Sequence, residues 1–240
     1  MKQPIRILLL ALLTAAASAA DVTRPNVLFI IADDLNKTLG CYSQKLVQSP
    51  NVDRLAARAV RFDRAYCQYP VCSPSRVSFL SGRRPEHTGM YGNEGASRTP
   101  LLQDAVFLPQ YFKQHGYFTA RLGKVFHIGR DVPECWVVTE EGTPGNITVS
   151  QPLEERKLGL GEYVAARHAN VGSDDRDHSY TMLNGGTDKL VDVRNGQRAA
   201  ELLTQGAKLN ADGQPFFLAV GFRRPHVPYI APQEYFQTRH

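Results

Sequence analysis

The sequence predicts an α/β fold, with a doubly wound sheet and helices on both of its faces. Two observations support this prediction. Residues 26–34 (NVLFIIADD) and 215–222 (PFFLAVGF) are nearly continuous apolar runs, which are typical of parallel strands buried on both faces. Such runs alternate along the chain with segments of helical periodicity, and this alternation favours an open sheet that binds ligands at the carboxyl ends of its strands.

Four helices and four strands are expected, including the two strands just described. The expected helices are 49–60, 75–82, 101–116 and 192–209, and the expected strands are 26–34, 61–67, 118–124 and 215–222. Ser49 or Asn51 is a candidate cap for the first helix, and Gly82 and Gly116 are suited to end the second and third. The region from about 130 to 185 is rich in glycine and charge, so we expect insertion loops there.

The N-terminal segment has the composition of a secretory signal peptide. Lys2 and Arg6 precede an apolar run at 7–13, and small residues follow at 15–20. The alternatives are a buried helix or a membrane span, but a span needs about 20 apolar residues and this run is shorter. We therefore expect residues 1–20 to be removed, and the mature protein to be exported, soluble and without a membrane partner. Its location would be periplasmic or extracellular, or lysosomal in a eukaryote.

The net charge bears on the possible ligands of the protein, and the number of cysteines bears on its disulfide bonds. The formal net charge is +5, which does not indicate nucleic acid as a partner and is weak support for an anionic ligand. The cysteines are Cys41, Cys67, Cys72 and Cys135. An even number in an exported protein ordinarily indicates two disulfides. If Cys72 has another role, one of the other three is left over, and the sequence leaves the pairing open.

Two adjacent carboxylates, Asp33 and Asp34, follow the first expected strand. Neighbouring acids repel each other unless a cation holds them, and oxygen ligands of this kind suit Ca²⁺ or Mg²⁺. The alternative is that the pair only caps a turn, since aspartate is common in loops.

Cys72 opens the sequence CSPSR at 72–76, which matches the C-x-P-S-R signature of the type I sulfatases and is followed by VSFLSGRRP. Other segments that resemble this family are 25–35, 49–76, 123–127 (GKVFH) and 216–229 (FFLAVGFRRPHVPY). The last two are most similar to the iduronate-2-sulfatase branch. The resemblance implies an alkaline-phosphatase-like sheet and a sulfatase catalytic domain, of which 21–240 is the N-terminal portion and the C-terminal part is missing.

The resemblance also implies a reaction, the removal of sulfate from sulfated sugars. In this family the cysteine is oxidised to formylglycine by a formylglycine-generating enzyme, and one hydroxyl of the hydrated aldehyde attacks sulfur while the other later expels sulfate. Such a reaction needs a nucleophile, a cation, positive donors and an acid for the leaving oxygen. A helix that begins near Ser73 would also direct its backbone N–H groups toward the anion.

Roles for individual residues follow from the same motifs. Asp33, Asp34 and the oxidised Cys72 correspond to metal ligands, with Ca²⁺ favoured over Mg²⁺. The other catalytic candidates are Arg76 beside the diol, Lys124 and His127 for sulfate and the diol proton, and His226 for sulfate and the leaving oxygen. Taken singly, a lysine is more often solvated surface and a histidine more often a core or loop residue.

One departure from the family pattern keeps alternatives open. The family takes further metal ligands and a second lysine from a later segment, and we expect these beyond residue 240. The chain could therefore be a truncated, non-catalytic fragment with an exposed sheet edge. A phosphodiesterase or phosphonate hydrolase of the same superfamily is another alternative. The sequence leaves the sugar and the linkage open.

Overall fold

The computed structural model describes residues 24–44, 47–140, 162–166, 180–184, 190–211, 213–227, 229–232 and 235. The signal peptide expected at 1–20 and most of the insertion loops expected at 130–185 lie outside these residues. No helix in the described part of the chain is both long and apolar enough to cross a membrane.

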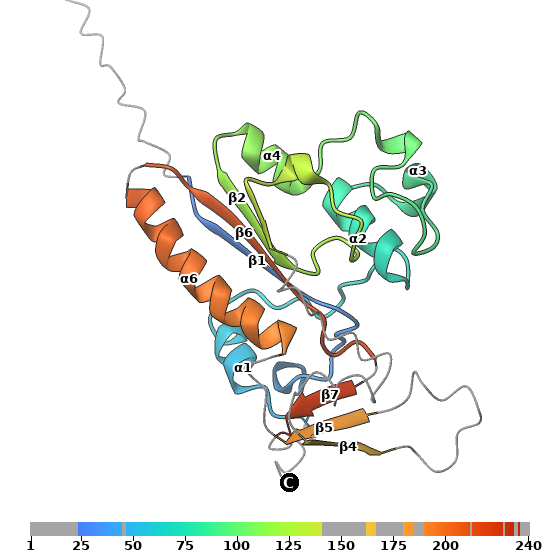
Figure 1. The fold of residues 1–240 in the computed structure, drawn as a ribbon, viewed down its shortest axis with the longest axis vertical. Helices are drawn as coiled ribbons and strands as arrows, with labels where there is room; N and C mark the ends of the chain where they lie inside the picture. Colours follow the sequence, from blue (N-terminus) through green and yellow to red (C-terminus); the bar gives the residue numbers. More distant parts are fainter. Residues whose placement is uncertain are drawn as a thin grey trace, which may run out of the picture.

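A parallel four-stranded sheet forms the centre of the fold, in the order β1-β6-β2-β3 (Figure 1). Its strands are β1 (Val27–Ala32), β6 (Phe216–Phe222), β2 (Phe118–Gly123) and β3 (Val138–Glu140). The last of these strands in the chain, β6, lies between β1 and β2, and pairs in parallel with both. Because Ala32 pairs with Phe222 and Gly123 pairs with Gly221, the segments that follow these three strands emerge at one edge of the sheet.

Helices cover both faces of this sheet, as the sequence predicted. On one face, α2 (Cys72–Ser81) and α4 (Leu108–Gln114) enclose a core that includes Val77, Phe107 and Phe217. On the other face, α6 (Val191–Ala211) packs through Ala199 and Leu202 against alternate residues of β2 and β6. Figure 1 shows α6 on the side of the sheet opposite to α2 and α4. The doubly wound α/β architecture is therefore confirmed.

Shorter elements complete the described chain. The remaining helices are η1 (Gly40–Tyr42), α1 (Pro50–Ala56), α3 (Pro85–Thr88), η2 (Pro100–Leu102) and η3 (Pro133–Cys135). A second sheet consists of β4 (Glu162–Ala166), β5 (Tyr180–Asn184) and β7 (Tyr229–Pro232), in which β5 pairs antiparallel with β4 and parallel with β7.

The structure corrects some of the expected elements. The strand expected at 61–67 is wrong, because these residues are exposed and form no strand. An alternating pattern produces a strand only where one face packs against a core, and Phe62 and Tyr66 are 69% and 79% exposed. Residues 138–140, expected in a loop, form the edge strand β3. The helix expected at 101–116 is shorter, because Pro109 stands at the start of α4.

Candidate active site

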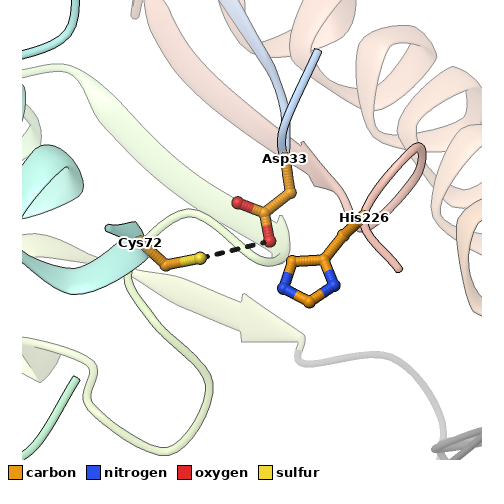
Figure 2. Close-up of side chains that lie close together, drawn as sticks. All are labelled: Asp33, Cys72 and His226. Carbon is orange, nitrogen blue, oxygen red and sulfur yellow. Dashed lines mark hydrogen bonds between the residues drawn. The ribbon is translucent and has the colours of Figure 1, made fainter. Parts of the chain in front are cut away.

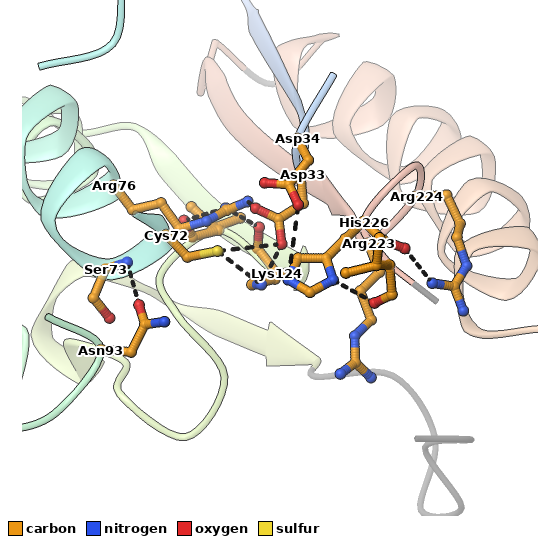
Figure 3. A network of polar contacts seen from close by, with 12 residues as sticks. Asp33, Asp34, Cys72, Ser73, Arg76, Asn93, Lys124, Arg223, Arg224 and His226 are labelled. Carbon is orange, nitrogen blue, oxygen red and sulfur yellow. Dashed lines mark hydrogen bonds and ion pairs between the residues drawn. The ribbon is translucent and has the colours of Figure 1, made fainter. Parts of the chain in front are cut away.

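The expected catalytic and metal-binding residues come from segments at the carboxyl edge of the main sheet (Figure 3). Asp33 and Asp34 follow β1, Lys124 follows β2 and His226 follows β6. Cys72 is the first residue of α2, and its end of the helix faces the same edge. The parallel register thus brings together side chains that are more than 190 residues apart in the sequence.

Asp33 is the buried centre of the site, with 4% of its surface exposed. Its Oδ1 accepts a hydrogen bond of 2.8 Å from Arg76 Nη2, and its Oδ2 accepts one from Lys124 Nζ. Burial by itself raises the pKa of this carboxyl, but the two cations outweigh burial and hold the pKa below its usual value. Asp33 is therefore an ionised carboxylate at neutral pH, compensated by two positive groups.

Arg76 is also buried, with 3% of its surface exposed. Besides its ion pair with Asp33, its Nη1 donates to the carbonyl oxygens of Lys124 and Val125, the latter at 2.9 Å. One guanidinium group therefore ties α2 to the segment that leaves β1 and to the segment that leaves β2. This arrangement fixes the distance between Cys72 and the two charged groups beside it.

The thiol of Cys72 points toward the carboxylate of Asp33 (Figure 2) and also lies close to the amine of Lys124 (Figure 3). Its Sγ is 3.8 Å from Asp33 Oδ2 and 3.7 Å from Lys124 Nζ. Burial raises the pKa of this thiol, and the opposing effect of Lys124 is smaller. The unmodified side chain is therefore a protonated thiol at neutral pH and a poor nucleophile.

The N-terminus of α2 does not offer the backbone groups that the sequence suggested. Ser73 N–H donates to Asn93 Oδ1 at 2.9 Å, and Ser75 N–H donates within the helix to Val71 at 3.0 Å. Pro74 has no N–H group. The expectation that backbone N–H groups beginning at Ser73 bind the anion is therefore wrong for residues 73–75.

His226 and Asp34 form the open side of the site. His226 Nε2 is 3.8 Å from Asp34 Oδ2, and the two side chains are 29% and 53% exposed. The turn that carries His226 is held by Asp192 in the first turn of α6, whose carboxylate accepts the backbone N–H groups of Arg223 and Arg224, each at 2.8 Å. Sequence reasoning missed Asp192, because an acid in the first turn of a helix predicts only a favourable helix end.

His127 is joined to the other candidates through Lys124, because both residues line one cavity. It follows Lys124 by three residues and lines a cavity between the end of β2 and the start of α6, together with Arg121 and Asn195. Its Nδ1 is buried and has no hydrogen-bond partner among the described residues. Burial, and secondarily Lys124, lower the pKa of His127, so its imidazole is neutral at neutral pH.

A divalent cation fits the donor set at this edge of the sheet. One ligating atom each from Asp33, Cys72 and His226 lie within 4.8 Å of one another, with Asp34 beside His226. With a thiol at position 72 this is a mixed oxygen, sulfur and nitrogen set, whereas Ca²⁺ and Mg²⁺ prefer oxygen ligands. With aldehyde or diol oxygens in place of the sulfur, Asp33, Asp34 and residue 72 would form an oxygen set suitable for a hard cation, without His226.

The cysteines are all free thiols in the structure. Cys135 is buried, and burial raises its pKa to about 12, whereas Cys67 is exposed. The two disulfides that an even number of cysteines suggested are therefore absent among Cys41, Cys67, Cys72 and Cys135, whose positions are all described.

The chain is similar to known proteins over most of its length. The family model "Sulfatase" matches residues 25–240. Human iduronate 2-sulfatase is 39% identical over 228 residues, which cover 92% of this chain and 38% of the human protein. A sulfatase of Formosa agariphila is 35% identical over 222 residues, which cover 90% of this chain and 42% of that protein. The chain thus spans about two fifths of the length of these relatives.

Solved structures share the fold. The phosphonate monoester hydrolase of Agrobacterium radiobacter superposes with a TM-score of 0.60 at 21% identity, over 89% of this chain and 44% of that one. At this identity the likeness shows the fold, which is alkaline-phosphatase-like, and it does not identify the ester that is cleaved.

Proposed function

Because the chain belongs to the sulfatase family, we propose that it hydrolyses sulfate esters of saccharides through a formylglycine made from Cys72. The observation that carries this proposal is the position of Cys72 Sγ, which lies within 4 Å of both Asp33 Oδ2 and Lys124 Nζ at the carboxyl edge of the sheet. A sulfuryl group held beside residue 72 would meet a cationic donor on one side and a site for a metal ion on the other.

The modified residue would supply a hydrated aldehyde: one hydroxyl would attack sulfur as the sulfur–oxygen bond to the sugar breaks, and loss of the proton from the other would re-form the aldehyde and release sulfate. The surrounding side chains prepare this chemistry. Lys124 Nζ, buried and already within 3.7 Å of the side chain of residue 72, can neutralise a sulfuryl oxygen as charge develops on it. Arg76 keeps Asp33 ionised and fixes α2 against the segment after β2, so the attacking group is held in one position.

The remaining candidates transfer protons or bind the metal ion. His226 lies on the open side of the site, where it can protonate the leaving oxygen of the sugar. His127, neutral because its pKa is lowered, can accept a proton from the diol. Asp33, Asp34 and residue 72 would hold Ca²⁺, or less favourably Mg²⁺, and the ion would draw electron density from the sulfuryl oxygens.

The class of ester is supported by sequence and not by fold, because a phosphonate monoester hydrolase has the same fold. The CSPSR motif and identities of 35% to 39% with sulfatases over most of the chain favour sulfate over phosphonate. Since two of the relatives are iduronate 2-sulfatases, an iduronate-2-sulfate unit of a glycan is the first substrate to test.

Maturation requires a partner and a compartment. Formylglycine at position 72 needs a formylglycine-generating enzyme that acts on the CSPSR segment. The leader-like composition of residues 1–20 supports export of the protein. The alternative of a non-catalytic fragment is decided by the activity measurement below.

The test is production of the chain with and without a formylglycine-generating enzyme, with Cys72→Ala as the control. We expect peptide mass spectrometry to find formylglycine at position 72 only with the modifying enzyme. We expect sulfate release from an aryl sulfate and from a sulfated iduronate disaccharide only from the modified chain. A chelator should abolish release and Ca²⁺ should restore it. Formylglycine without any sulfate release would support the fragment alternative, and an unmodified Cys72 in the presence of the enzyme would refute the proposal.

A further inference from the structure

Asn93 closes the N-terminus of α2 from a loop distant in sequence. The side chain of the N-cap residue, Val71, makes no capping hydrogen bond. Instead, Asn93 Oδ1 accepts the N–H of Ser73 at 2.9 Å (Figure 3). The backbone N–H is always a donor, so the atom of the amide that faces it must be the oxygen. The NH₂ group of Asn93 therefore faces away from Ser73, and no hydrogen bond joins it to any described residue.

The loop that carries Asn93 is fixed to the segment that carries the catalytic candidates Lys124 and His127. Arg130 Nη1 donates to the carbonyl oxygen of Gly95, and Ser97 Oγ donates to the carbonyl oxygen of Arg130. The backbone N–H of Arg130 in turn donates to the backbone carbonyl oxygen of His127 at 3.0 Å. The amide of Asn93 thus has a defined position relative to residue 72 and its neighbours.

The chemical choice at position 93 points to an anion. An aspartate would accept the Ser73 N–H as well as asparagine does, and its charge would favour the positive end of α2. A carboxylate there would, however, repel any anion bound beside Cys72. The neutral amide keeps the acceptor for the helix and adds a donor, and Figure 3 shows its nitrogen turned toward the side on which Cys72 and Lys124 lie.

We infer that Asn93 is a sulfate-binding residue, whose Nδ2 donates to a sulfuryl oxygen held beside residue 72 while its Oδ1 caps α2. This inference rests on the proposed function, because it requires a sulfuryl group at that position. The sulfuryl group of an ester carries only acceptor oxygens, so a neutral donor complements it without adding charge to a site that already has Lys124 and Arg76.

The test compares substitutions that separate the cap from the donor. Asn93→Asp keeps the acceptor and loses the donor, Asn93→Ala loses both, and Asn51→Asp makes the same change of charge on α1. The probe is inorganic sulfate, titrated at constant ionic strength into the folded ¹⁵N-labelled chain and followed by NMR. A thermal melt of each variant reports on the cap, and the same titration is made on the chain with formylglycine at position 72.

We expect Asn93→Asp to melt no lower than the original chain and yet to bind sulfate at least about tenfold more weakly, because a donor is replaced by a like charge. Asn93→Ala should melt lower and bind about threefold to tenfold more weakly, and Asn51→Asp should bind within about twofold of the original chain. If Asn93→Asp bound sulfate as well as the original chain or Asn51→Asp, Asn93 would be only a helix cap. If the original chain bound no sulfate in either form, the proposed function and this inference would both be overturned.

Discussion

The two sides of the candidate site differ in how their charges are held. On one side, Asp33, Arg76 and Lys124 are at most 6% exposed and form direct ion pairs. On the other, Asp34 and His226 are about half and one third exposed, and 3.8 Å separates their nearest atoms. The first side is part of the interior of the fold, whereas the second consists of partly exposed side chains on the loops that follow β1 and β6.

This difference has energetic consequences. Buried charges are stable only when they are paired, so removal of one partner leaves the other uncompensated at a cost of about 3–5 kcal/mol. Exposed pairs are screened by water and contribute about 0–1 kcal/mol. The buried side therefore cannot change without loss of stability, while the open side can change in chemistry at little cost to the fold.

The largest effect on stability is expected from Arg76→Ala. Removal of this guanidinium leaves Asp33 with one of its two cations and leaves the carbonyl oxygens of Lys124 and Val125 without their donor. We expect the free energy of unfolding to fall by about 3–5 kcal/mol in urea titrations at pH 7. The matched control is Arg61→Ala, whose exposed guanidinium pairs with Asp63, donates to the Cys41 carbonyl and lies over the Tyr42 ring, and its loss should cost less than about 1 kcal/mol. Equal effects of the two substitutions would show that burial of the pair does not matter.

An intermediate effect is expected from Asp192→Ala, at the boundary of the two sides. Two backbone N–H groups, of Arg223 and Arg224, lose their acceptor, which should cost about 1–3 kcal/mol. The imidazole NMR signals of His226 should shift, since Asp192 holds the turn before it, and Asp192→Asn should restore part of both properties. The control Asp53→Ala removes the acceptor of the Cys41 N–H on another loop. If Asp53→Ala moved the His226 signals as much, the positioning role of Asp192 would be rejected.

The smallest effect on stability is expected from His226→Ala, on the open side. Its partly exposed side chain lies at 3.8 Å from its charged neighbour, so the free energy of unfolding should change by less than about 0.5–1 kcal/mol. Sulfate release by the formylglycine form should nevertheless fall by about 100-fold or more, because the proton donor for the leaving oxygen is lost. A variant that kept its turnover, or lost stability as Arg76→Ala does, would contradict the distinction between the two sides.

Much of the fold follows from the sequence, because a strand that is buried on both faces consists of nearly continuous apolar residues. The run before Asp33 and the run before Arg223 are strands, and Gly82 ends α2 with a φ of 69°. The pattern at 61–67 was equally regular but produced no strand. Regular alternation shows what a segment could form, whereas pairing and packing decide whether it forms.

By itself, the sequence determined which chemical groups stand at the ends of the strands and at the start of α2: two adjacent carboxylates, a cysteine in the CSPSR motif, a lysine and a histidine. Only the tertiary structure decided which of them touch. Insertion of β6 between β1 and β2 places Asp33 against Lys124 and close to His226, while His127 lines a cavity that it shares with Lys124. It also decided the contacts of Asp192 and Asn93, which support the site from other elements. The reason is that a motif records neighbours along the chain, whereas a hydrogen bond between distant residues depends on the order and register of the strands that carry them.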